Sequence, residues 1–201
     1  SKINIEEKDT WEDKTFITLD IDWADDDVLI DSIKLLEKTN IEATWFVTHY
    51  TPLLERIRSN EKFELGIHPN FNYLLESSAK PGDSCEQILD KILEVVPEAK
   101  SIRSHSMVQS TRLLELFNSK GLIYDCNHFI PVQSKIELKP WQLWNGLTRI
   151  PYFWEDDIAC LYENKIKIEE LLLKKGLRVF DFHPIHIFLN TENLKRYEST
   201  R

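Results

Sequence analysis

The segment TFITLDIDWADDD, residues 15–27, contains the signals from which the fold can be predicted. Its first half is rich in β-branched, aromatic and aliphatic residues, which is typical of a buried β-strand. Asp20 and Asp22 then follow on the same side of that strand, because side chains alternate with a period of two. Helix capping does not require them, since Asp25 to Asp27 already supply an acidic first turn. Neighbouring carboxylates repel unless a cation or a shared proton relieves them, so the pair predicts metal binding or acid–base chemistry.

Six more apolar or aromatic runs follow, so the predicted strands are 15–21, 43–49, 63–68, 101–106, 122–127, 149–154 and 178–183. Helical periodicity separates many of them, and strands that alternate with helices predict a mainly parallel sheet. Seven such strands in 201 residues favour a closed or nearly closed barrel over an open sheet. The predicted fold is therefore α/β: a distorted, seven-stranded (β/α) barrel. We expect one domain over residues 1–201, with a polar N-terminal extension at 1–14.

Several predicted helices have recognisable ends. Ser84 and Gln87 form a capping-box pattern, and two later helices stop at Gly121 and Gly176. The helix at 25–39 is expected to bury one face, formed by Val28, Ile30, Ile33, Leu35 and Leu36. Two long irregular stretches, 69–84 and 128–148, have the length at which loops are usually functional.

The composition limits the class of partner. A net charge of −9 disfavours nucleic acid and anionic membrane surfaces, which both require a basic face, and fits a neutral or weakly cationic substrate better. Three widely spaced cysteines predict neither a disulfide framework nor a zinc ribbon. Because no apolar run reaches about 18 residues, we expect a soluble, cytoplasmic protein.

Polar residues gather at the carboxyl ends of the predicted strands, and five of the seven ends carry a histidine. In α/β folds the ligand site lies beyond these ends, so the side chains are expected to converge. His68 and Asn72, four residues apart, offer a nitrogen and an oxygen suited to a divalent cation. For His105, a substrate contact, a metal ligand and a packing role are all open.

Two further groups suggest catalysis. Arg103 ends an apolar strand, where its charge would hold one of the paired aspartates ionised. Asp181 and His183 share a side of the last strand, and a carboxylate can orient an imidazole as a general acid. His186 is a less direct candidate in the same motif. Trp154 and the other aromatic residues of 141–154 suit stacking on sugar rings, a core or the surface of a homo-oligomer.

These residues stand in motifs that resemble, in order, those of the polysaccharide deacetylase (NodB-like carbohydrate esterase) family: LDID at 19–22, ATWFV at 43–47, GIHPNFN at 66–72, RSHS at 103–106 and FDFHP at 180–184. The resemblance implies a distorted barrel of about seven strands, a divalent metal, often zinc, and hydrolysis of N- or O-acetyl groups on an acetylated carbohydrate.

By position, the resemblance makes Asp20 the catalytic base, Asp22 and His68 metal ligands, Arg103 the residue that orients the base, and His183 the general acid. Asn72 stands where the family has a second metal histidine. The tyrosine that commonly follows the motif arginine and proline is missing. These departures leave a catalytically impaired, glycan-binding relative as an alternative. A haloacid-dehalogenase-type phosphatase, which also begins with D-x-D after a strand, is a second alternative.

Overall fold

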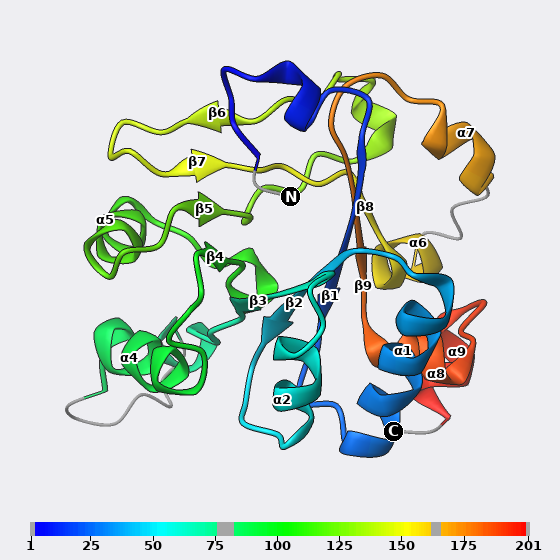
Figure 1. Ribbon diagram of the computed structural model, residues 1–201, viewed down its shortest axis with the longest axis horizontal. Helices are drawn as coiled ribbons and strands as arrows, with labels where there is room; N and C mark the ends of the chain where they lie inside the picture. The colour runs from blue at the N-terminus through cyan, green and yellow to red at the C-terminus, as the bar shows by residue number, and fades with distance from the viewer. Residues whose placement is uncertain (1–2, 76–82, 162–165, 200–201) are drawn as a thin grey trace.

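The computed structural model describes residues 3–75, 83–161 and 166–199. Its nine strands form one sheet in the order β6-β7-β5-β4-β3-β2-β1-β9-β8, and their pairs are parallel except for β6 with β7 (Figure 1). The strands are β1 (Thr15–Asp20), β2 (Ala43–Val47), β3 (Phe63–Ile67), β4 (Ser101–Ile102), β5 (Tyr124–Asp125), β6 (Trp141–Gln142), β7 (Thr148–Arg149), β8 (Trp154–Glu155) and β9 (Arg178–Phe182).

Residues 148–155 connect the two ends of the curled sheet. Their first part, β7, pairs with β5, and their last part, β8, pairs with β9. Between them the Ile150 N–H donates to the Asp125 carbonyl at 2.9 Å, and the Phe153 N–H donates to the Val179 carbonyl at 3.4 Å. One segment therefore contacts both sides of the sheet, which curls into a partial barrel.

The predicted α/β fold is confirmed, whereas the predicted count of seven strands is not. Each predicted strand overlaps a strand of the structure, but the sixth is divided into β7 and β8. Pro151 lies at the division, where its missing N–H interrupts the ladder of hydrogen bonds. β6 adds an antiparallel strand within the predicted loop 128–148.

Helices cover the outside of the sheet. They are α1 (Asp26–Thr39), α2 (Leu53–Arg58), α3 (Asn72–Leu75), α4 (Cys85–Val95), α5 (Thr111–Ser119), α6 (Asp156–Leu161), α7 (Ile168–Leu172), α8 (Pro184–Leu189) and α9 (Leu194–Glu198). α1 packs against α2 and α8, and α9 lies beside α8 (Figure 1). Among the described residues, no helix combines the length and the apolar character required to cross a membrane.

The predicted helix boundaries are largely as expected. The Ser84 hydroxyl accepts from the Gln87 N–H at 3.2 Å and so caps α4. Gly121 directly follows the Lys120 cap of α5 and has a φ of 81°, as expected at a helix end. The helix predicted to stop at Gly176 instead ends at Leu172, four residues earlier. The predicted loop 69–84 contains α3, and its residues 76–82 lie outside the described residues.

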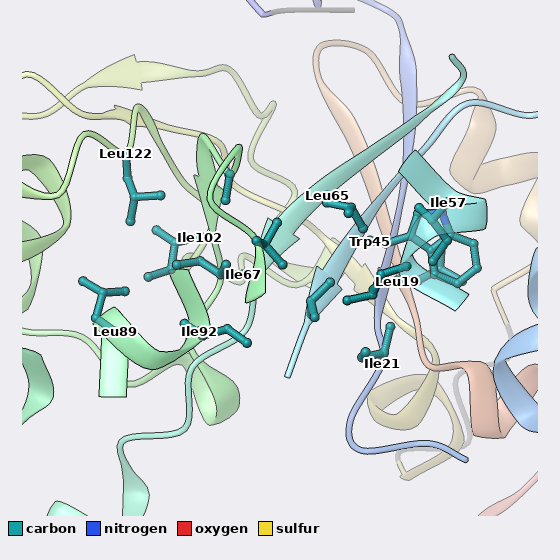
Figure 2. Packing of buried hydrophobic residues seen from close by; sticks show 14 of the residues in the cluster. Leu19, Ile21, Trp45, Ile57, Leu65, Ile67, Leu89, Ile92, Ile102 and Leu122 are labelled. Atoms are coloured by element: carbon teal, nitrogen blue, oxygen red, sulfur yellow. The ribbon is translucent and has the colours of Figure 1, made fainter. Parts of the chain in front are cut away.

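Two apolar clusters lie on opposite faces of the sheet. Along β2, Trp45 and Val47 belong to the cluster beneath the helices, whereas Phe46 between them belongs to the inner cluster. Figure 2 shows the outer cluster, in which Trp45 lies beside Ile57 of α2. Alternation also turns Thr18 of β1 inward, and side chains of β1–β5 and β9 line a cavity of about 60 Å³ on this face.

The predicted apolar face of α1 is wrong at Leu35, which is 45% exposed. The buried apolar residues are instead Leu29, Ile33 and Leu36, at spacings of four and three. This spacing defines one face of a helix with 3.6 residues per turn, and Leu35 points away from it.

The two leucines give a matched test of the core. Leu29→Ala should lower the free energy of unfolding by about 2–5 kcal/mol, because it leaves a cavity in a packed core. Leu35→Ala, in the same helix, should change it by less than about 1 kcal/mol. Urea denaturation followed by circular dichroism measures both, and equal losses would contradict the packing described here.

Candidate functional site

Strand ends meet at one pocket of about 100 Å³. Asp20 ends β1, whereas His68, Arg103 and His183 follow directly after β3, β4 and β9. All four line the pocket, and so do Asp22, Ser104, His105, Ser106, Met107, Tyr152, Glu155 and Asp157. Because parallel strands carry their carboxyl ends at the same rim, residues 163 positions apart, from Asp20 to His183, reach a common space.

Arg103 is the buried cation of this pocket, only 1% exposed. Its guanidinium donates to Asp20 Oδ1 at 2.9 Å and contacts Asp181 Oδ1. The Phe46 and Tyr152 rings lie on it, with centroids 4.5 and 4.4 Å from Cζ. Burial raises the pKa of Asp181 well above its usual range, although the charge of Arg103 opposes this shift. One cation therefore binds two acidic side chains in a dry environment.

Three possible metal ligands converge beside Asp20. Asp22 Oδ1 lies 3.2 Å from His68 Nε2 and 3.2 Å from His105 Nδ1, and the two nitrogens are 3.3 Å apart. Asp22 Oδ1 is buried, and its short contacts lack hydrogen-bond geometry. Two ligands about 2.1 Å from a tetrahedral ion lie about 3.4 Å apart, so these three donors fit a zinc-like ion.

The electrostatic surroundings of Asp22 favour its ionised form. Burial alone would raise the pKa of this carboxyl group. The imidazoles of His105 and His68, together with the charge of His183, outweigh burial and lower the pKa well below its usual range. A carboxylate that stays ionised near neutral pH is what a cation site requires.

Asp156 is the carboxylate that orients His183. Its Oδ1 lies 2.7 Å from His183 Nδ1, and its Oδ2 accepts the His183 backbone N–H at 2.8 Å. His183 Nε2 faces Asp22 Oδ2 at 3.6 Å. Burial lowers the pKa of His183, but the bond to Asp156 and the nearby carboxylates of Asp181 and Asp20 raise it well above its usual range.

This arrangement differs from the prediction that Asp181 orients His183. β9 ends at Phe182, and His183 caps α8, so the alternation that would place residues 181 and 183 on one side no longer applies. Asp181 instead contacts Arg103, and its Oδ1 lies 2.7 Å from the Thr18 hydroxyl.

Three other predicted site residues lie outside this pocket lining. Asn72 begins α3, and its amide donates to the Ser106 hydroxyl at 3.0 Å. Trp154 lines a neighbouring groove and packs on Phe180 and Phe182. His186 is buried in α8, where its Nδ1 lies 3.2 Å from the Thr191 hydroxyl.

The family model for WbmS-like polysaccharide deacetylases matches residues 17–201. The chain belongs to this family. It is 48% identical to a Bordetella bronchiseptica protein described as an inferred polysaccharide deacetylase involved in O-antigen biosynthesis; the match covers 99% of this chain and 83% of that one, with a TM-score of 0.93. A Mycobacterium smegmatis protein that is also described as an inferred polysaccharide deacetylase, 19% identical, shares the fold over 92% of this chain and 81% of its own, with a TM-score of 0.53. No curated protein matches the chain.

Sequence reasoning gave neither Asp156 nor Glu155 a role in a deacetylase site. Both lie in the stretch WEDD at 154–157, and their position after a predicted strand was the available signal. Burial, reinforced by Asp157, raises the pKa of Glu155 to about 8, and the Tyr152 hydroxyl donates to its carboxyl group at 3.3 Å. A carboxyl group that is protonated near neutral pH therefore borders the pocket.

A buried polar network holds the loop that carries His105. The Asn127 carboxamide oxygen accepts the Ser104 N–H at 2.6 Å, and its nitrogen donates to Asp125 at 2.7 Å. Arg149 donates to the other oxygen of Asp125 at 2.5 Å. These contacts join residues remote in sequence, so strand periodicity could not reveal them.

Replacement of Arg103 should reveal the buried charges that it neutralises. We expect Arg103→Met to lower the free energy of unfolding at pH 7 by about 3–5 kcal/mol, because the buried side chains of Asp20 and Asp181 lose the guanidinium that binds them. The control Arg112→Met, at an exposed position, should stay within about 0.5 kcal/mol.

The loss of unfolding free energy in Arg103→Met should also depend on pH. The folded-state pKa of Asp181 is already raised, and removal of Arg103 should raise it further. Protonation then favours the folded variant at low pH, and this stability is lost as pH rises through the folded-state pKa. Urea denaturation should therefore give a smaller deficit at pH 5 than at pH 8. A deficit that is independent of pH, or no larger than that of Arg112→Met, would contradict this account.

Proposed function

We propose that this chain is a metal-dependent deacetylase that removes acetyl groups from an N- or O-acetylated sugar or polysaccharide precursor. The observation that carries the proposal is the convergence of Asp22, His68 and His105 on one point, at mutual distances of 3.2–3.3 Å, between Asp20 and His183. Family membership and the description of the Bordetella relative support the same activity. Both favour deacetylation over the phosphatase alternative.

Asp22, His68 and His105 would hold the metal ion, with Asp22 and His68 in the roles that the family resemblance implies. Two imidazole nitrogens and one carboxylate oxygen suit zinc, so zinc remains the predicted ion. A cytoplasmic location also remains a prediction. A bound divalent ion lowers the pKa of water and polarises a carbonyl oxygen. Because His105 supplies a third donor, the asparagine at position 72 does not leave the site short of ligands.

Asp20 is placed to act as the base. It is 3% exposed, and one carboxylate oxygen accepts from Arg103 while the other lies 3.4 Å from His68 Nδ1. Arg103 therefore fixes the orientation of the carboxylate at the floor of the pocket. In this position Asp20 can accept a proton from the water that attacks the acetyl carbonyl carbon.

His183 is placed to act as the acid. Asp156 binds its Nδ1, which leaves Nε2 facing the pocket 3.6 Å from Asp22. A proton held at Nε2 can pass to the leaving amine or alcohol of the sugar when the tetrahedral intermediate breaks down. Asp157 adds a carboxylate to the pocket lining beside the catalytic groups, which favours a neutral sugar over an anionic one.

Metal affinity distinguishes His105 from Asn72 as a ligand. His105→Ala should weaken zinc binding by at least about tenfold, because one of three donors is lost. Asn72→Ala should leave zinc affinity within about twofold, since its amide contacts Ser106 instead. Competition with a chromophoric chelator measures both affinities, and the opposite order would show that Asn72 is the ligand.

Acetate release tests the role of Asp20 as the base and the role of Asp156 as the residue that orients the acid His183. We expect Asp20→Asn to lower kcat by about 10²–10⁴ and Asp156→Asn to lower it by about tenfold or more, both with zinc still bound. Asp22→Ala should lose the metal itself. Asp31→Asn, an exposed carboxylate on α1, serves as the matched control and should keep the wild-type kcat. Wild-type turnover in both Asp20→Asn and Asp22→Ala would overturn the assignment.

A further inference from the structure

Trp23 occupies a turn that disfavours its residue type. The Ala24 N–H donates to the Ile21 carbonyl at 2.8 Å, and the two residues between them, Asp22 and Trp23, have φ values of 39° and 56°. Positive φ at both central positions is the geometry of a type I′ turn, which glycine and asparagine favour. A bulky side chain there is strained, and such strain concentrates at functional sites.

Burial does not explain the tryptophan. Its side chain belongs to neither apolar cluster, and the residue is 47% exposed. The turn is nevertheless held in place, because the Trp23 N–H donates to the Thr48 hydroxyl at 3.1 Å. The fold thus keeps a large aromatic surface in contact with water through a backbone conformation that a smaller residue would adopt more easily.

The indole stands beside the proposed metal site. Its ring meets the His105 ring in a T-shaped contact, with centroids 5.1 Å apart and planes at 79°. His105 lines the pocket, so the indole contacts a residue of the pocket lining. Trp154 is less available for such a role, because it packs on Phe180 and Phe182.

We propose that Trp23 is a sugar-binding platform, on which the C–H face of a neutral pyranose ring of the substrate stacks while its acetyl group enters the pocket. This inference rests on the proposed function and names the group that recognises the sugar. An exposed indole offers a flat apolar surface that matches the C–H face of an uncharged sugar ring. Trp23 would therefore determine specificity without taking part in proton transfer.

The test compares Trp23→Gly, Trp23→Phe and the control Trp144→Gly, at a tryptophan that is 64% exposed. All three are made in an Asp20→Asn background, which blocks turnover. Calorimetry with zinc-loaded protein measures the Kd for N-acetylglucosamine and N,N′-diacetylchitobiose. Trp23→Gly should weaken binding at least about tenfold while keeping or raising Tm, because glycine adopts a positive φ without strain. Trp23→Phe should retain most of the affinity, and Trp144→Gly should leave it unchanged.

Several results would overturn the platform: an unchanged Kd in Trp23→Gly, no binding of either sugar by the Asp20→Asn parent, or a fall in zinc affinity as large as the fall in sugar affinity. The last result would mean that Trp23 acts only through His105. Turnover by the otherwise wild-type protein separates this proposal from the deacetylase assignment. Trp23-dependent sugar binding without acetate release from any acetylated sugar supports the platform and contradicts the deacetylase. Acetate release with the same KM in wild type and Trp23→Gly supports the deacetylase and contradicts the platform.

Discussion

The burial of Arg103 is the constraint on which the rest of the structure depends. A guanidinium that is 1% exposed must have anionic partners, because an unpaired charge in a dry interior is strongly destabilising. Its partners Asp20 and Asp181 come from β1 and β9, and Arg103 itself follows β4. The ion cluster therefore spans the inside of the curled sheet, and the aromatic rings on either side of the guanidinium exclude water from it.

The same interaction connects stability to the proposed chemistry. Asp20 is both a partner of Arg103 and the carboxylate closest to the group of possible metal ligands. Those ligands lie on segments whose backbone is strained: Asp22 has a positive φ, and so do Ser106 and Met107 beside His105. Hydrogen bonds that the Ser104 and Trp23 N–H groups donate to Asn127 and Thr48 hold the neighbouring backbone in place. The site is thus fixed before any ligand arrives, which is the condition for effective electrostatic catalysis.

The contacts between side chains in the site show what could not be predicted from the sequence. Period-two alternation predicted a common side for Asp20 and Asp22, but β1 ends at Asp20 and Asp22 lies in the turn that follows, although both residues line the pocket. The alternation also failed for Asp181 and His183, because β9 ends between them. Asp156 reaches His183 from a segment 27 residues earlier in the chain. Likewise, a helical spacing of four suggested Asn72 as the neighbour of His68, whereas the loop after β4 brings His105 closer.

The sequence by itself determined the α/β class, the order of the strands along the chain and the concentration of reactive side chains at their carboxyl ends. These features follow from local rules, since alternation, capping and strand direction act over a few residues. Only the tertiary structure decided which carboxylate orients His183, which residue completes the group around Asp22 and His68, and how residues 148–155 connect β5 to β9. Those contacts form beyond the ends of the strands, where turns and loops set the direction of each side chain and no sequence period applies.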